Sequence, residues 1–325
     1  MLRAYGPNCE GAIIDARREK IPTGATWIDL EEPTDEEEKL VENCLGLDVP
    51  TPEEMAEIEP SSRLFERNGA LYMTASLLYG IEEGEPAISP MGFVLADQRL
   101  VTVRYASPKP VRAFSDHARR EPAIVPDALT ALCGLLDAIV DRLADELEKV
   151  GAEIEKISGH IFETKIDQRR IPATRLTALL TRIGQTQMLL SKIRETEAST
   201  SRLLSFLGAS ARLRSRRNRD AKEHVASLAE DTRSLSAHSD YLSNHLYFML
   251  DAAVGLIGIE QNAAMKLFSW VAIVFLPPTL IAGIYGMNFD FMPELHWHLG
   301  YPWALALMAV SAVAPLWYLK RRGWI

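Results

Sequence analysis

Residues 267–285 read LFSWVAIVFLPPTLIAGIY, and residues 301–319 read YPWALALMAVSAVAPLWYL. Each stretch holds 19 residues without a charged side chain. Because a helix of about 20 apolar residues spans the hydrocarbon core of a bilayer, the two stretches predict two transmembrane helices. The alternative interpretation is a buried helical hairpin in a large soluble core, which the length and hydropathy of the two stretches disfavour.

The flanks of these stretches predict an orientation. Five of the six tryptophans lie at or after Trp270, and most of them are near the span ends, as in the aromatic belts of membrane proteins. Residues 286–300 contain no Lys or Arg, whereas Lys266 precedes the first stretch and a Lys-Arg-Arg sequence at 320–322 follows the second. The positive-inside rule therefore predicts both termini in the cytoplasm and the short loop outside.

The remainder of the 325-residue chain is rich in charge. Of 35 Lys and Arg and 44 Asp and Glu residues, only five lie after Lys266, and the net charge of the chain is −9. The 47% share of hydrophobic residues excludes a disordered chain, and the acidic balance argues against nucleic acid as a partner. The three cysteines form no CxxC pair, so a disulfide framework or a thiolate zinc site is not expected.

The part of the chain before the membrane spans shows two secondary-structure patterns, one after the other. Residues 1–125 alternate short strand and helix signals and predict a cytoplasmic α/β domain. We expect strands at 27–30, 71–79, 92–96 and 100–105, the last two forming a hairpin. Thr34 and Glu37 form a capping box that predicts the start of a helix.

From residue 126 to 266 the pattern is helical and nearly free of helix breakers, which predicts a cytoplasmic stalk. We expect helices over 127–163 and 172–211 and a third from about 220 into 285, roughly 100 Å long. Residues 267–325 then form the membrane domain. The predicted fold class is an α+β cytoplasmic domain with long stalk helices and two C-terminal transmembrane helices.

One face of the predicted third helix carries small or polar residues at alternating steps of four and three, which is the period of a left-handed bundle. These positions are Asp251, Gly255, Gly258, Asn262, Met265, Ser269, Ala272, Leu276, Thr279, Gly283 and Gly286. Close packing of membrane helices explains such a stripe, and so does the lining of a pore. Because two transmembrane helices per chain cannot enclose a path for ions across the membrane, a pore requires several subunits in a ring.

The loop after the first span carries a distinctive sequence pattern. It reads Tyr-Gly-Met-Asn-Phe over 285–289 and Phe-Met-Pro-Glu-Leu over 291–295, and the final span is followed by Lys-Arg-Arg-Gly-Trp-Ile. With Glu-Gln-Asn at 260–262 and Phe-Leu-Pro-Pro-Thr at 275–279, this pattern resembles the CorA family of divalent-cation channels. The resemblance covers most of the chain, more weakly towards the N-terminus.

The resemblance implies a funnel-shaped homopentamer in the cytoplasmic (inner) membrane, surrounded by membrane lipid. It implies transport of Mg²⁺, and also of Co²⁺ and Ni²⁺, down an electrochemical gradient through a channel that intracellular Mg²⁺ closes. Mg²⁺ is then substrate and regulator, and neither a cofactor nor an enzymatic activity is expected.

The resemblance also assigns roles to residues. Gly286, Met287 and Asn288 are the expected selectivity filter, and Asp251 is the expected acidic metal position near the cytoplasmic end of the pore. The expected pore-lining residues are Asn262, Met265, Leu276, Thr279 and Gly283. Independently of the family, Asp290 and Glu294 in the outer loop could concentrate cations, or simply face water.

Three alternatives stay open. The first is a zinc transporter of the related ZntB branch, which usually has Val in place of Met287; His296 and His298 would suit zinc. The second is a membrane-anchored enzyme, although the chain has no nucleophile elbow, glycine-rich phosphate loop or HExxH motif. The third is a structural or signalling stalk without transport. A passive pore would also permit efflux.

Overall fold

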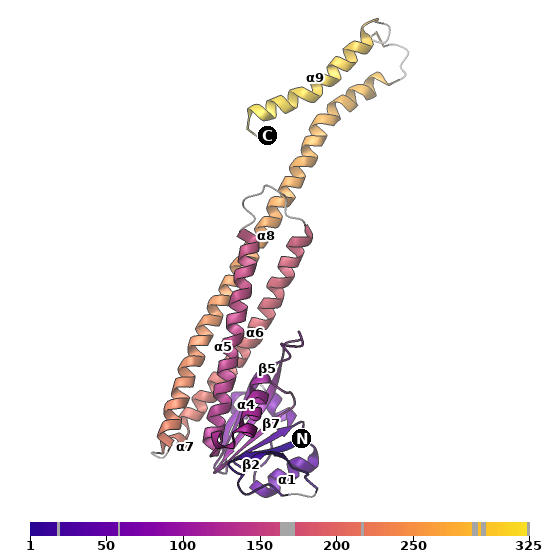
Figure 1. Ribbon diagram of the computed structural model, residues 1–325. Coiled ribbons are helices and arrows are strands. Elements are labelled where there is room, and N and C mark those ends of the chain that lie inside the picture. Colours follow the sequence, from indigo (N-terminus) through magenta and orange to yellow (C-terminus); the bar gives the residue numbers. More distant parts are fainter. Residues whose placement is uncertain are drawn as a thin grey trace. The chain divides into compact units, whose positions relative to one another are not determined.

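The computed structural model describes residues 1–17, 20–57, 59–162, 173–215, 218–287, 292–293 and 297–323. These residues divide into two compact units (Figure 1). The first unit contains the described residues of Met1–Ile166 and Ala178–Leu250, and the second contains those of Asp167–Thr177 and Asp251–Ile325.

A seven-stranded sheet forms the α+β part of the first unit. Its strands are β1 (Leu2–Gly6), β2 (Cys9–Ile13), β3 (Trp27–Glu31), β4 (Leu64–Arg67), β5 (Ala70–Tyr79), β6 (Ala87–Ala96) and β7 (Arg99–Arg104). The strand order is β2-β1-β3-β7-β6-β5-β4, and only the pair β3–β7 is parallel. The predicted hairpin is confirmed, because β6 and β7 pair through a turn at Asp97–Gln98.

Helices cover both faces of this sheet. On one face, Ile28 and Leu30 of β3 lie in a buried cluster with Val41 of α1 (Asp35–Leu45) and Met55 of α2 (Pro52–Ala56). Gly92 of β6 permits this packing, because a Cβ atom there would lie 2.9 Å from the Met55 sulfur.

The opposite face packs against two longer helices, α4 (Lys109–Arg120) and α5 (Ala128–Phe162) (Figure 1). Trp27 is fully buried there, stacked on Tyr5 with the ring centroids 4.3 Å apart and tilted against Phe114 of α4 at 5.5 Å. Two short segments, α3 (Pro60–Arg63) and the 3₁₀ helix η1 (Pro122–Ile124), complete this part.

The capping signals act as the sequence predicts. The Thr34 hydroxyl accepts a hydrogen bond from the Glu37 amide, and the Glu37 carboxylate accepts one from the Thr34 amide. The same reciprocal pair, not foreseen from the sequence, starts α2 at Thr51 and Glu54. Directly after α1, Gly46 adopts the left-handed backbone conformation that ends many helices.

The helical part of the first unit is built from α5, α6 (Ala173–Ala209), the short α7 (Ala211–Arg214) and the first part of α8 (Arg219–Tyr285). In Figure 1, α5, α6 and this part of α8 lie side by side. Polar contacts connect them. Arg182 of α6 donates to Glu153 of α5 at 2.8 Å, and Arg194 of α6 donates to Asp240 of α8 at 2.6 Å. The helix bounds agree with the predicted ones within a few residues.

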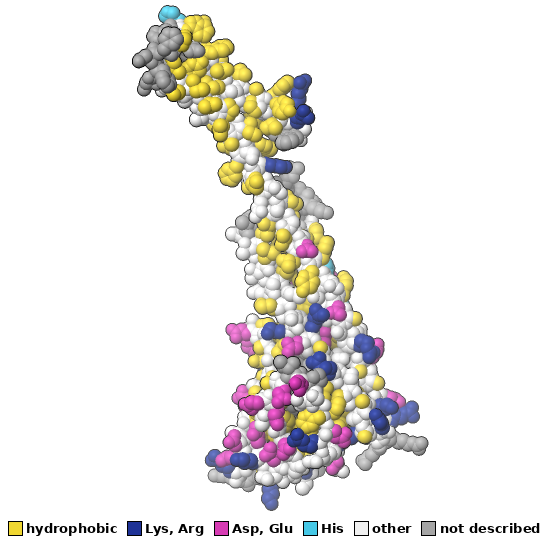
Figure 2. Space-filling model, turned by 180° about the vertical axis from the view of Figure 1, so that it is seen from behind, with side chains coloured by type: hydrophobic (Ala, Val, Ile, Leu, Met, Phe, Trp, Pro, Cys, Tyr) yellow, Lys and Arg dark blue, Asp and Glu magenta, His cyan; other side chains and the backbone are white. Residues whose placement is uncertain are grey.

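The second unit contains the rest of α8 and α9 (Gly300–Arg321), the two helices that are long and apolar enough to cross a membrane. Their most apolar 18-residue windows are 0% and 6% buried, so neither helix is the core of a soluble protein within the described residues. Hydrophobic side chains dominate the visible face of this unit (Figure 2). Helix α8 continues through Pro277 and Pro278 without interruption.

Candidate ion-conduction site

The residues assigned to the pore lie on one stripe of α8, and their side chains are exposed. Met265 and Leu276 are each 66% exposed, unusually high for large apolar side chains in a folded chain. Asp251, Asn262, Thr279 and Gly283 are exposed as well. Other faces of this part of α8 are exposed too, with Phe268 at 73% and Phe275 at 64%, so its whole surface faces something other than the described residues of its own chain.

Glycines on the stripe are not explained by contacts within the chain. A Cβ atom built at Gly255, Gly258 or Gly283 would meet no other described atom within 4 Å. Glycine costs about 1 kcal/mol relative to alanine inside a helix. Three open glycines therefore leave room beside α8 for a neighbouring helix or a passage.

The hydroxyl groups on the stripe donate their hydrogen bonds within the helix. Thr279 Oγ1 donates to the Phe275 carbonyl oxygen at 2.7 Å, and Ser269 Oγ donates to that of Met265 at 2.9 Å. The lone pairs of both oxygens stay available to water. No Asp or Glu occurs between Asn262 and Gly286. Neutral oxygens of this kind suit an ion that keeps its hydration shell, as Mg²⁺ tends to do.

The end of α8 begins the predicted selectivity loop. Gly286 donates its amide to the Ala282 carbonyl at 2.9 Å, and Met287 donates to that of Ile284 at 3.2 Å, which closes the last helical turn. Met287 is 45% exposed. The other loop residues assigned from the sequence, Asn288, Asp290 and Glu294, lie outside the described residues.

The structure places the predicted metal position, Asp251, on helix α8. Asp251 is exposed, and the described residues contain no group of three or more His, Cys, Asp and Glu side chains that could hold a metal ion. To hold a cation, Asp251 would therefore need ligands beyond the described residues of one chain, such as its own copies in other subunits.

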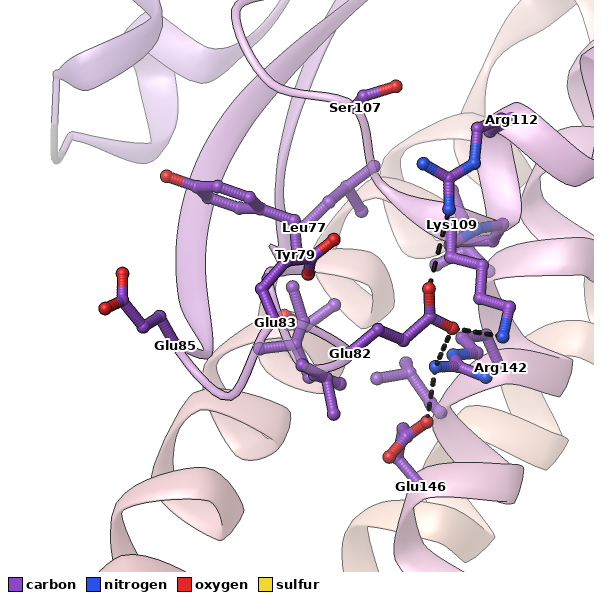
Figure 3. Close-up of a pocket in the computed structure, with 17 residues that line it drawn as sticks. Leu77, Tyr79, Glu82, Glu83, Glu85, Ser107, Lys109, Arg112, Arg142 and Glu146 are labelled. Carbon is purple, nitrogen blue, oxygen red and sulfur yellow. Dashed lines mark hydrogen bonds and ion pairs between the residues drawn. The ribbon is translucent and has the colours of Figure 1, made fainter.

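Sequence reasoning missed two charged features of the first unit. One is a buried ion pair between Asp29 and Arg104 on the parallel strands β3 and β7. The other is a cluster of three cations around Glu82 beside a cavity (Figure 3). Their members are far apart in sequence and carry no motif, so only the folded chain brings them together.

Solved structures with a similar fold exist. The complete CorA magnesium transporter of Methanocaldococcus jannaschii matches with a TM-score of 0.77, covering 100% of this chain and 99% of that chain at 21% identity. The full-length CmaX protein matches with a TM-score of 0.63 over 91% of this chain and 87% of that chain, at 15% identity. At these identities the likeness concerns the fold alone.

Comparison of amino-acid sequences shows to which protein family the chain belongs. The family described as CorA-like Mg²⁺ transporter protein matches residues 23–321. Proteins named magnesium transport protein CorA from Pasteurella multocida and Escherichia coli are each 36% identical over 301 residues, covering 93% of this chain and 92% of the relative. This is a family of membrane transport proteins, and the two apolar C-terminal helices fit transmembrane spans. The chain therefore belongs to the family of CorA-like Mg²⁺ transporter proteins.

Proposed function

We propose that this chain is one subunit of a channel that moves Mg²⁺, and also Co²⁺ and Ni²⁺, across the cytoplasmic membrane down an electrochemical gradient. The observation that carries the proposal is the exposed stripe of α8, which holds small and neutral polar residues and leads into a Gly-Met-Asn sequence. Its relatives named as magnesium transport proteins match nearly the whole chain.

The assembly we propose is a funnel-shaped homopentamer with both termini in the cytoplasm. Five copies of α8 line the pore, and five copies of α9 surround them in contact with lipid. The open space beside Gly255, Gly258 and Gly283 supports close approach of neighbouring α8 helices, because no contact within the described chain uses it. Native mass spectrometry of the purified protein tests this, and a monomer would contradict it.

In the proposed pore, ions pass with their water shells. Rings of Asn262 and Thr279 offer neutral oxygens that bind hydration water weakly, whereas rings of Met265 and Leu276 form apolar constrictions that close by dewetting. Asn288 supplies the amide oxygens of the selectivity filter. Asp251 binds cations at the cytoplasmic end, and intracellular Mg²⁺ closes the channel.

Zinc transport of the ZntB type is the second candidate, because the sequence carries His296 and His298 close to Asp290 and Glu294. Met287 favours magnesium over this branch, and so do the relatives named above. His296 lies outside the described residues and His298 is exposed, so their placement adds no support for zinc.

The decisive experiment measures ion entry into liposomes that hold the purified full-length protein, with Mg²⁺ and Zn²⁺ supplied separately. We expect Mg²⁺ entry that Asn288→Ala abolishes. Gln261→Ala is the matched control, because it also removes a side-chain amide but lies one residue off the stripe. Zinc entry without magnesium entry, or no flux of either ion, would contradict the proposal.

A further inference from the structure

A cavity of about 330 Å³ lies within the first unit, between the end of β5, the loop that follows it, and the helices α4 and α5 (Figure 3). This volume is at the lower end of the range for small-molecule sites. Its wall is apolar on one side, where Leu77, Ile139 and Leu143 are almost fully buried. Its other side is strongly charged.

Three cations from two helices, α4 and α5, meet on one carboxylate at this charged side. Lys109 forms an ion pair with Glu82, and the Nη2 atoms of Arg112 and Arg142 lie 3.5 and 3.6 Å from its carboxylate oxygens. In Figure 3 these three side chains converge on Glu82, whereas Glu85 extends away from them. The hydrogen bond from Lys109 lowers the pKa of Glu82.

Within the ion-paired cluster the cations outnumber the carboxylates, although Glu83 and Glu85 also line the cavity. Arg142 shares its charge with Glu146, to which it lies at 2.7 Å, but Lys109 and Arg112 have Glu82 as their common partner. Helix α4 starts at Lys109 after Pro108, without a side-chain cap. The positive end of its dipole therefore adds to the field of the cations.

The cavity also contains an unused polar group. Thr196 of α6 lines it and is 2% exposed, and its hydroxyl has no hydrogen-bond partner among the residues that the structure describes. Buried hydroxyls are normally paired, because burial without a partner costs free energy. A ligand with polar atoms in the cavity would provide the missing partner once the Thr196 side chain turns its shielded hydroxyl towards the cavity.

We propose that this cavity binds a soluble phosphate monoester, whose phosphate replaces the Glu82 carboxylate between Lys109, Arg112 and Arg142. A phosphate carries more negative charge than a carboxylate and offers three acceptor oxygens, so it matches three converging cations better. The organic part of the ligand lies on Leu77, Ile139 and Leu143. Glu82 is 41% exposed on a turn, which lets it move into water when the phosphate enters.

The test is isothermal titration calorimetry on the full-length protein in detergent, with inorganic phosphate and phenyl phosphate as the two probes. We expect phenyl phosphate to bind more tightly than inorganic phosphate, because only the ester covers the apolar wall. Glu82→Gln removes the competing carboxylate and is expected to tighten binding of both probes about tenfold. Arg112→Gln is expected to weaken binding by about the same factor.

Arg119→Gln is the matched control, because Arg119 lies on the same helix with similar exposure, 59% against 52% for Arg112, and does not line the cavity. We expect wild-type affinity for this variant. Absence of binding to both wild type and Glu82→Gln would overturn the proposal, as would equal losses in Arg112→Gln and Arg119→Gln. The readout is binding and does not depend on ion transport.

Discussion

Arg104 and Asp29 form a buried ion pair across the parallel strands β3 and β7. Arg104 Nη2 donates to Asp29 Oδ2 at 2.9 Å, and the side chains are 3% and 0% exposed. Thr102 Oγ1 donates to the same carboxylate at 2.7 Å, and Arg104 Nη1 donates to Glu31 at 2.7 Å. Burial alone lowers the pKa of Arg104, but the facing carboxylates raise it above its ordinary value. The charges are thus fully paired inside the sheet.

Asp29→Asn is therefore expected to destabilise the first unit strongly, because it leaves the Arg104 charge without its main partner. Loss of one member of a buried pair costs about 3–5 kcal/mol. Urea unfolding of the full-length protein, followed by tryptophan fluorescence, measures the loss in free energy of unfolding. Glu36→Gln, which breaks the exposed pair with Arg17, should cost about 1 kcal/mol or less. Equal losses in the two variants would contradict this account.

Two glycines with positive φ provide a second test. Gly80 (φ +74°) begins the turn that carries Glu82, and a Cβ atom there would overlap the Glu85 carbonyl oxygen. Gly69 (φ +77°) has the same backbone conformation, but a Cβ atom there would meet nothing within 4 Å. We expect Gly69→Ala to cost about 1–2 kcal/mol from backbone strain alone, and Gly80→Ala at least about twice that. The same urea unfolding measures both, and equal costs would show that the overlap is relieved.

Because Glu197 of α6 is buried, we expect the free energy of unfolding to depend on pH. Burial raises its pKa, and the hydrogen bond that it accepts from Ser239 at 2.8 Å only partly opposes this; Arg194 and Asp240 are the charged groups nearby. Because the folded pKa lies above the unfolded value of about 4.3, the protonated form stabilises the fold at low pH. That stabilisation is lost as the pH rises through the folded pKa.

Glu197→Gln keeps the size of the side chain and carries no charge, so it should escape this loss. We expect the free energy of unfolding of the variant to exceed that of the wild type by more at pH 8 than at pH 5. Urea unfolding at the two pH values measures the difference. A pH-independent difference would show that Glu197 does not titrate differently in the folded and unfolded chain.

Much of the helical structure could be predicted from the sequence. The bounds of α5, α6 and α8 follow from long periodic patterns with few Gly or Pro residues, and the capping box at Thr34 marks the start of α1. The strands β1, β2 and β4 were not predicted. They are only four or five residues long and carry charged side chains, so neighbouring strands determine them rather than local propensity.

The charged clusters could not be predicted for a different reason. Asp29 meets Arg104 because β3 and β7 pair in parallel, a register that connects residues 75 positions apart. Lys109, Arg112 and Arg142 meet Glu82 through the packing of a turn against two helices. The α8 stripe, in contrast, depends only on helical periodicity and is visible in the sequence; the roles of its residues in conduction stay predictions.

The apolar constriction at Leu276 gives the last prediction. If a ring of Leu276 side chains closes the pore by dewetting, then Leu276→Ser should wet it and increase Mg²⁺ entry into liposomes, above all when internal Mg²⁺ is high and the wild-type channel is closed. Leu267→Ser is the matched control, because Leu267 is an exposed leucine of the same helix, 44% against 66%, but lies on the opposite face. We expect wild-type flux from the control. Equal flux from both variants would show either that the stripe does not face the pore or that the gate lies elsewhere. An increase in Leu267→Ser alone would place the pore-lining face on the opposite side of the helix.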